Sequence, residues 1–304
     1  MQRLRVQLTG YVQGVGFRPC VYRVAKALDL TGWVKNNSEG VEIEIQGKKS
    51  PQFIECLKEN LPPLATLDTL HFKNISPLLD EDDFSILPSD VAGKLSAKIS
   101  PDMSICDDCL KELFDSSGRF YLYPFLNCTN CGPRLTITEN LPYDRAQTSM
   151  RDFQLCNACA DDYQNPLDRR YHAQPIACQQ CGPALSMPVT EIVGCLRRGE
   201  IIALKGVGGY QLICDATNSA AIKKLRQRKL RDSKPFALLM LNAKSAEHFV
   251  EISKEEKALL ESWQRPIVLL KKHSVISESR LSNHIADGLS ELGIMLPSSA
   301  LHYL

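Results

Sequence analysis

The first 90 residues carry two kinds of hydrophobic pattern. Apolar and polar residues alternate at 4–8 and again at 41–45, which is the period-two pattern of half-buried strands. Between them, Val21, Ala25 and Leu28 recur at the spacing of one helix face. A hairpin is indicated at 36–40, where Asn-Asn-Ser-Glu-Gly lies between two strand-like runs. The order strand, helix, strand, strand, helix, strand predicts a split βαβ, ferredoxin-like arrangement.

The pattern changes twice further along the chain. Residues 80–83 are acidic and residues 88–97 are small and polar, so we predict a linker there and a new domain from about residue 100. After residue 187, a helix at 190–198, a buried strand at 201–204, a glycine loop and a basic helix follow in an α/β rhythm. We therefore expect an α+β multidomain chain, with domains at 1–90, 100–186 and 187–304.

Composition narrows the class of protein. The chain has 304 residues, of which 44% are hydrophobic and 23% charged, as is typical of soluble globular proteins. Its apolar stretches are far shorter than the roughly 20 residues of a membrane span, and its N-terminus lacks the apolar core of a signal peptide. We therefore expect a cytoplasmic protein without a membrane segment. Charge is uneven, because residues 187–304 carry 17 basic and 12 acidic side chains, whereas 100–186 carry 7 and 11.

An internal repeat marks the predicted middle domain. It contains four C-x-x-C pairs, with 18 residues between the two pairs of each copy and an offset of 50 between copies. Without an export signal, such pairs predict four-thiolate zinc sites rather than disulfides. The economical pairing places one structural zinc ion in each copy, and crossed pairing between the copies is the alternative. The ligands are Cys106, Cys109, Cys128 and Cys131 in the first copy, and Cys156, Cys159, Cys178 and Cys181 in the second.

His172 and four single cysteines also have side chains that can bind metal. His172 lies close to the second copy, where it is a ligand, a substrate contact or a packing residue. The other four are single cysteines within helix or strand patterns, and we interpret them as small apolar fillers: Cys20, Cys56, Cys195 and Cys214.

A glycine-rich loop connects the first predicted strand to the first predicted helix. Its glycines let the backbone turn its N–H groups toward an anion, and such a nest at a helix N-terminus binds phosphate. Arg18 adds a permanently charged, bidentate partner. These residues alone leave a plain strand-to-helix connection open as the alternative. The candidate phosphate loop consists of Gln13, Gly14, Val15, Gly16 and Phe17.

A second candidate anion site lies in the last third of the chain. Seven Lys or Arg side chains fall within residues 223–234. A solvated helix face normally interleaves acidic with basic residues, so this run favours binding of nucleotide phosphates or RNA. The candidate nucleotide- or substrate-binding residues are Lys205, Gly206, Gly208, Gly209, Arg226, Arg228, Lys229, Lys234 and Arg265.

Two motifs near the N-terminus resemble those of acylphosphatases. The run from Gly10 to Arg18 resembles their signature loop, and residues 32–36 with 40–42 resemble their second motif. The resemblance implies a catalytic pair, in which Arg18 holds the phosphate of an acyl phosphate and Asn36 positions the attacking water. Because an acyl phosphate is already activated, positioning and charge neutralisation suffice without a protein base.

The last third resembles YrdC-type domains. Residues 205–209, 234–236 and 265–269 match three stretches with which that family binds ATP and a carboxylate-like substrate. Together with the two preceding segments, the chain resembles the N-terminal part of the hydrogenase-maturation carbamoyltransferase (HypF) family. This resemblance implies hydrolysis of carbamoyl phosphate, formation of a carbamoyl adenylate from ATP with magnesium, and transfer to a cysteine thiol of a partner maturation protein. The product would feed the cyanide ligands of nickel–iron hydrogenases.

A rival function and an expected truncation accompany this interpretation. The rival is a zinc-finger or YrdC-like protein that binds nucleic acid or modifies tRNA, and the acidic balance of residues 100–186 argues against it. YrdC-type domains are longer than the roughly 118 residues from Met187 to Leu304. We therefore expect an incomplete α/β domain that leaves Ile201, Leu204 and Val268 under-covered, in a chain that hydrolyses acyl phosphate but fails at adenylation.

Overall fold

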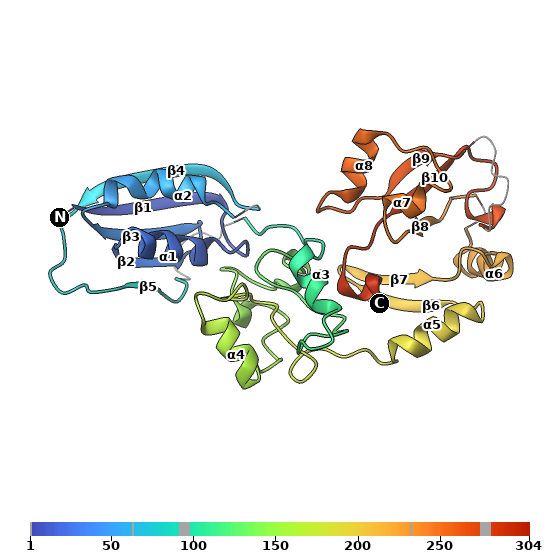
Figure 1. Ribbon diagram of the computed structural model, residues 1–304, viewed down its shortest axis with the longest axis horizontal. Helices are drawn as coiled ribbons and strands as arrows, with labels where there is room; N and C mark the ends of the chain where they lie inside the picture. The colour runs from blue at the N-terminus through green and yellow to red at the C-terminus, as the bar shows by residue number, and fades with distance from the viewer. Residues whose placement is uncertain (1, 63, 91–97, 232, 274–280) are drawn as a thin grey trace. The chain divides into compact units, whose positions relative to one another are not determined.

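A computed structural model of the chain describes residues 2–62, 64–90, 98–231, 233–273 and 281–304. Contacts divide the chain into two compact units, one of residues 1–121 with 125–183 and one of residues 122–124 with 184–304 (Figure 1). The first unit thus contains the first two predicted domains. Of the predicted linker at 88–97, residues 91–97 lie outside the described residues.

A five-stranded sheet opens the first unit, in the order β4-β1-β3-β2-β5. Strand β1 runs antiparallel to β3 and β4, and β2 runs antiparallel to β3, which confirms the predicted split βαβ arrangement. The sequence did not predict β5, which pairs parallel to β2 at the sheet edge. The elements are β1 (Gln2–Tyr11), α1 (Phe17–Ala27), β2 (Thr31–Asn36), β3 (Val41–Gly47), a 3-10 helix (Ser50–Gln52), α2 (Phe53–Glu59), β4 (Thr66–Ile75) and β5 (Phe84–Ile86).

The acidic stretch at 80–83 is tied to the sheet, so the prediction of a linker there was wrong. Glu81 lies 2.5 Å from the guanidinium of Arg3, whose side chain is only 1% exposed. Asp83 pairs with Lys26 of α1. A buried guanidinium requires carboxylate partners, and Arg3 obtains them from Glu81 and from Glu44 of β3, at 2.7 Å. These ion pairs lead the chain into β5.

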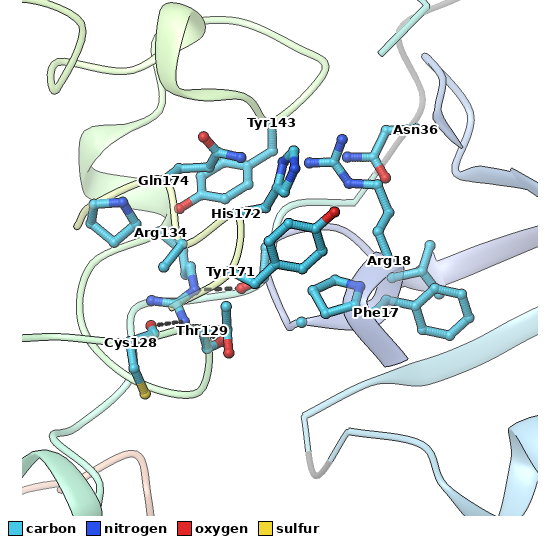
Figure 2. A pocket seen from close by; sticks show the side chains of 16 residues that line it. Phe17, Arg18, Asn36, Cys128, Thr129, Arg134, Tyr143, Tyr171, His172 and Gln174 are labelled. Atoms are coloured by element: carbon cyan, nitrogen blue, oxygen red, sulfur yellow. Dashed lines mark hydrogen bonds between the residues drawn. The ribbon is translucent and has the colours of Figure 1, made fainter. Parts of the chain in front are cut away.

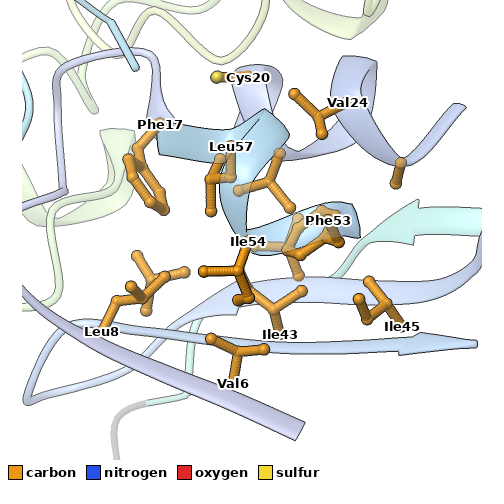
Figure 3. Close-up of a cluster of buried hydrophobic side chains, with 14 of the residues drawn as sticks. Val6, Leu8, Phe17, Cys20, Val24, Ile43, Ile45, Phe53, Ile54 and Leu57 are labelled. Atoms are coloured by element: carbon orange, nitrogen blue, oxygen red, sulfur yellow. The ribbon is translucent and has the colours of Figure 1, made fainter. Parts of the chain in front are cut away.

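The hydrophobic core of this domain lies between one face of the sheet and two helices. Figure 3 shows α1 and α2 on the same side of the strands, with alternate residues of the strands pointing toward them. Leu4, Val6 and Leu8 of β1 are buried there, as the period-two pattern predicts. Phe17 and Val21 of α1 pack into the same cluster, so burial of the helix face fixes where α1 begins relative to the sheet. The loop between β1 and α1 is thereby held at one end of the sheet.

The rest of the first unit, residues 98–121 and 125–183, is called the zinc module here and contains both cysteine repeats. Its two α-helices are α3 (Asp107–Leu113) and α4 (Asn157–Gln164). Each begins directly after the first cysteine of its repeat, since Cys106 and Cys156 are the N-cap residues. Two 3-10 helices, Leu135–Ile137 and Arg145–Gln147, lie between them. The repeat predicted from spacing is therefore also a repeat of local structure.

The second unit has a three-stranded sheet, β8-β10-β9, and a two-stranded hairpin, β6-β7. Its core cluster includes Ile222 from α6, Leu260 from α8 and Ile294 from β10, so helices cover one face of the larger sheet. The elements are α5 (Val189–Arg197), β6 (Ile202–Gly206), β7 (Gly209–Ile213), α6 (Ser219–Lys229), β8 (Ala237–Leu239), α7 (Ala243–Ala246), α8 (Lys254–Glu261), β9 (Val268–Lys271), a 3-10 helix (Asn283–Ile285), β10 (Glu291–Met295) and α9 (Ala300–Tyr303).

Two expectations about burial in this unit were wrong. The strand predicted as buried is β6, in which only Leu204 is buried, because β6 pairs with β7 alone. Leu204 and Val268 are 7% and 8% exposed, so they are covered within the second unit, whereas Ile201 is half-buried. The exposed apolar residue of β9 is Leu269, which is 60% exposed and lies on the face opposite to Val268 and Leu270.

No α-helix among the described residues is long and apolar enough to span a membrane.

Candidate functional site

The glycine-rich loop connects β1 to the first turn of α1. Gly14 and Gly16 both have left-handed backbone angles, with φ of 72° and 74°, which favour glycine. Gly16 is the N-cap residue of α1, so the free N–H groups of an 11-residue helix begin at this loop. The loop therefore has left-handed glycines at a helix N-terminus, which is the local geometry that the predicted anion nest requires.

The two predicted catalytic residues line one pocket together with this loop. Arg18 lies in the first turn of α1 and is 7% exposed, and Asn36 ends β2 and is 1% exposed. Both belong to the pocket lining, as do Gly14, Gly16 and Phe17 (Figure 2). The fold thus brings together residues from β2, the loop and α1 that are separate in the sequence.

The remaining two residues of the predicted loop point elsewhere. The Gln13 side chain donates to the carbonyl oxygens of Asn37 and Gly40, each at 2.8 Å, and so ties the loop to the β2-β3 hairpin. Val15 is fully buried in the core of the sheet. Only the backbone of these two residues is left to contact an anion.

A second wall of the pocket comes from the zinc module, and the sequence did not predict it. Tyr143, Tyr171, His172 and Gln174 also line the pocket (Figure 2). Of these, only His172 was a candidate from the sequence. Residues 169–175 read Arg-Arg-Tyr-His-Ala-Gln-Pro, and this run of large polar and aromatic residues outside any regular pattern was the available signal.

Hydrogen bonds join this wall to the loop. The backbone N–H of Tyr143 donates to Gln13 Oε1 at 3.1 Å, and Arg134 Nε donates to the carbonyl oxygen of Gly14 at 2.5 Å. The ring of Tyr143 packs on Gly14 so closely that a Cβ there would lie 2.9 Å from its Cε1 atom. Gly14 therefore has two reasons to be glycine, its left-handed φ and this contact.

Two arginines line the pocket, Arg18 and Arg134. Arg18 Nη2 lies 3.1 Å from Asp144 Oδ1, and Nη1 lies 3.4 Å from Ser89 Oγ. Burial, reinforced by the nearby Arg18 guanidinium, lowers the pKa of His172 to about 4. Burial also raises the pKa of Tyr143 to about 12. Both side chains are therefore neutral at pH 7. Because the Arg134 guanidinium donates to backbone carbonyl oxygens, including those of Gly14, Thr129 and Cys131, Arg18 is the pocket arginine available to an anion.

Three buried polar atoms of the pocket residues have no hydrogen-bond partner among the described residues. They are Asn36 Oδ1, Tyr143 Oη and Gln174 Nε2. Buried polar groups are nearly always paired in native proteins, and leaving one unpaired costs about 1–3 kcal/mol. Three such atoms around one pocket are available to water molecules or to a polar ligand.

The eight repeated cysteines form two four-sulfur clusters with pairing within each repeat, which resolves the alternative of crossed pairing. In the first cluster, Cys106 Sγ lies 3.7 Å from Cys128 Sγ, and Cys109 Sγ lies 3.5 Å from Cys131 Sγ. In the second, the Sγ atoms of Cys156 and Cys178 are 3.7 Å apart. A tetrahedron with Zn–S bonds of about 2.3 Å has sulfur–sulfur edges of about 3.8 Å, so the clusters fit zinc.

Two arginines in equivalent positions of the repeats cross between the clusters. Arg119 of the first copy lies 3.0 Å from Cys159 Sγ of the second, and Arg169 of the second copy lies 3.1 Å from Cys109 Sγ of the first. Each guanidinium also pairs with a carboxylate of the opposite copy, Asp162 and Glu112 respectively. Outer-shell contacts of this kind orient ligands and stabilise thiolate charge. Each cluster therefore depends on the other copy.

The candidate nucleotide residues of the second unit lie largely on the surface. Lys205, Arg228, Lys229 and Lys234 are exposed, as is Gly208 in the β6-β7 turn, whereas Gly206 and Gly209 are half-buried. Arg265 has a left-handed φ of 46° and a buried Nε without a partner among the described residues.

Arg226 differs from the other cations of the basic run. Its guanidinium donates to four backbone carbonyl oxygens, at distances between 2.8 and 3.1 Å: those of Arg231, Lys234, His284 and Ile285. These bonds join α6 to the segments that precede β8 and β10. Such contacts favour a structural role for this arginine.

Comparisons with known proteins match every part of the chain. The acylphosphatase family model matches residues 4–86, the HypF finger model matches 105–138 and 155–187, and a telomere recombination model (Sua5, YciO and YrdC) matches 194–304. The chain is 45% identical to carbamoyltransferase HypF2 of Cupriavidus necator over 99% of its length, and 47% identical to carbamoyltransferase HypF of Rhizobium leguminosarum over 100%. It spans 39% of the length of each of these relatives.

Solved structures give the same result. A full-length HypF in a phosphate- and nucleotide-bound form superposes with a TM-score of 0.93 at 43% identity, and covers 99% of this chain and 41% of that chain. The HypF of T. kodakarensis superposes with a TM-score of 0.89 at 40% identity, over 100% of this chain and 40% of that one.

Proposed function

The chain corresponds to the N-terminal portion of the HypF carbamoyltransferase family, and we propose that its first unit hydrolyses carbamoyl phosphate to carbamate and phosphate. One observation carries this proposal. The anion nest, Arg18 and Asn36 line a single pocket at the N-terminus of α1. The motif that resembles acylphosphatases is thereby an assembled site in which Arg18 is the arginine available to an anion.

The residues have separate tasks in the proposed reaction. The loop N–H groups and Arg18 bind the phosphoryl oxygens and neutralise their charge. Asn36 Oδ1 is a buried acceptor without a partner among the described residues, and it accepts a hydrogen bond from the attacking water. The water oxygen bonds to phosphorus, and the phosphorus–oxygen bond to the carbamoyl group breaks with its electron pair passing to carbamate. The proton lost by the water is taken up by the phosphate product.

The side chains around the pocket agree with a reaction that needs no protein base. His172 is neutral at pH 7, but burial and the nearby Arg18 guanidinium lower its pKa to about 4. It is therefore a poor proton acceptor. Asp144 pairs with Arg18 and orients its guanidinium beside the loop. Catalysis then comes from positioning and charge neutralisation, which an activated acyl phosphate requires most.

The later steps of the family reaction are also part of this proposal. A longer protein would form a carbamoyl adenylate from ATP, with magnesium as its counter-ion, in the YrdC-like domain, and would transfer the carbamoyl group to a cysteine thiol of a partner maturation protein. Support comes from the matched model at 194–304 and from the relative solved with phosphate and nucleotide. Two structural zinc ions in the cysteine clusters and a cytoplasmic location complete the proposal.

Phosphate release by the 304-residue chain tests the first step. The purified chain is incubated with carbamoyl phosphate, and inorganic phosphate is measured above a buffer blank. A phosphate monoester serves as the control substrate, because its leaving group is not activated. We expect rapid release from carbamoyl phosphate and none from the monoester. Release at the blank rate from both substrates would reject the proposal.

A further inference from the structure

We propose that Tyr143 and Gln174 of the zinc module recognise the carbamoyl group, so that the pocket selects acyl phosphates whose acyl carbon carries an NH2 group. The inference rests on the proposed hydrolysis in this pocket and adds a specificity subsite to it. Neither residue belongs to the motifs that resemble acylphosphatases, since Tyr143 lies between the two cysteine repeats and Gln174 lies between the two C-x-x-C pairs of the second repeat.

The subsite consists of polar atoms that are buried and unpaired. Tyr143 is 2% exposed and Gln174 is 1% exposed, and both line the same pocket as Arg18 and Asn36. Tyr143 Oη and Gln174 Nε2 lack hydrogen-bond partners among the described residues. Figure 2 shows Arg18 and Asn36 on one side of His172, with Gln174 and Tyr143 on the other. A ligand whose phosphate contacts Arg18 would thus present its other end to these two side chains.

The amide of Gln174 is held with its donor group free. Its Oε1 accepts the backbone N–H of Arg145 at 2.7 Å and the hydroxyl of Tyr163 at 2.9 Å. Two donors to one oxygen fix which end of the amide is oxygen and which is nitrogen. Nε2 is therefore a preorganised donor, and it suits the carbonyl oxygen of an acyl group.

The phenol of Tyr143 is likewise fixed in place and uncharged. Its ring rests on Gly14, and its backbone N–H is bound by Gln13. Because the phenol is neutral at pH 7, its oxygen can accept a hydrogen bond from an amide N–H. A carbamoyl NH2 group supplies such a donor, whereas an acetyl CH3 group of similar size does not. The phenol therefore distinguishes carbamoyl phosphate from acetyl phosphate.

Tyr143→Phe is the sharpest test, because it removes only the hydroxyl and keeps the ring on Gly14. We compare kcat/KM for carbamoyl phosphate with kcat/KM for acetyl phosphate in the wild-type chain and in the variant. A site built to bind a substrate NH strongly rejects an analogue without it, so we expect the wild type to prefer carbamoyl phosphate and the variant to lose about tenfold of that preference. The matched control is Tyr22→Phe, which removes a phenol of α1 outside the pocket lining and should leave the preference unchanged.

Gln174→Glu is the second variant. It retains an oxygen for Arg145 and Tyr163 but replaces the Nε2 donor with a carboxylate oxygen. Both acyl phosphates have a carbonyl oxygen, so kcat/KM should fall at least about tenfold for both, while zinc content stays unchanged.

The outcomes separate this inference from the proposed function. An unchanged preference in Tyr143→Phe, or undiminished activity in Gln174→Glu, would overturn the subsite while hydrolysis itself stands. A wild-type chain that hydrolyses neither acyl phosphate would reject the proposed function, and the subsite with it.

Discussion

The two regions that looked like anion sites in the sequence turn out to be built very differently. In the first unit, Arg18 is 7% exposed and lies in a pocket with two walls that come from distant parts of the chain. In the second unit, most cations of the basic run are exposed, and the half-buried Arg226 is occupied by backbone carbonyls. In the first unit, the short loop motif lies in a pocket because residues of the zinc module cover it. In the second unit, the dense charge lies mainly on exposed side chains.

Removal of one cysteine ligand is the strongest test of the enclosed site. Cys106→Ser should cost the first cluster its zinc and unfold the zinc module locally, because a structural zinc site contributes on the order of 10 kcal/mol of folding free energy. The second cluster should also lose metal more readily, since Arg119 and Arg169 cross between the copies. The rate of hydrolysis should decrease because the zinc module forms one wall of the pocket. The sheet of the first 90 residues should remain folded.

Metal analysis and phosphate release measure this effect. Cys56→Ser is the matched control, because Cys56 lies in α2 outside both clusters. Two zinc ions and full activity in Cys106→Ser would contradict the claim that the site depends on the wall formed by the zinc module.

Arg18→Ala should remove hydrolysis almost completely. Loss of a preorganised charge at the transferring group costs about a hundredfold to a thousandfold in rate. Arg18 is the pocket arginine that backbone carbonyls do not occupy, unlike Arg134. Asp144, which pairs with Arg18, is partly exposed and can be hydrated in the variant, so the fold should persist. The measurement is kcat/KM for carbamoyl phosphate, with exposed Arg228→Ala of the basic run as the control. Equal losses in the two variants would contradict the contrast between the regions.

Arg226→Ala should destabilise the second unit without a specific effect on hydrolysis. Hydrogen bonds from a charged donor contribute about 1.5–3 kcal/mol, so we expect a loss of about 2–3 kcal/mol in unfolding free energy. Denaturant unfolding followed by Trp263 fluorescence in a Trp33→Phe background would isolate this unit, because the chain has 2 tryptophans. Arg228→Ala should leave the midpoint unchanged. An unaltered midpoint in Arg226→Ala would contradict the structural role of this arginine.

The buried histidine makes the first unit sensitive to pH. The pKa of His172 is about 4 in the folded chain, below its ordinary value of 6.5, so between these values the unfolded chain binds more protons. Stability from this group is complete above about pH 6.5 and is lost as the pH falls toward 4. We expect the first unit to lose up to about 2 kcal/mol between pH 7 and pH 5 by this route. His172→Gln should flatten that part of the profile, and an identical profile in the variant would show that His172 does not titrate in this range.

Asn36→Ala should have the smallest effect, and this effect should be on kcat rather than on KM. Phosphate would still bind through the loop and Arg18, whereas the attacking water would lose its acceptor. We expect kcat to fall about tenfold while KM changes little. A rise in KM at constant kcat would instead place Asn36 in phosphate binding. Steady-state kinetics with carbamoyl phosphate distinguish the two results.

Local pattern was sufficient for much of this protein. Alternation at 4–8 and 41–45 gave the correct strands, and the helical spacing after Val21 gave α1, because each pattern reflects which face of one element is buried. The cysteine spacing predicted both four-sulfur clusters, since a C-x-x-C turn and its partner pair constrain the ligands almost independently of the rest of the fold.

Only the tertiary structure decided how the site is closed and which cations are available. Tyr143 and Gln174 reach the loop across more than a hundred residues of chain, and such contacts leave no period or spacing in the sequence. The same holds for Glu81 against Arg3, for the crossed arginines of the zinc module, and for Arg226 among backbone carbonyls. Local patterns determine elements and metal turns because the interactions are short in sequence. Burial, pairing and enclosure depend on which distant segments pack together, and that was decided by the fold.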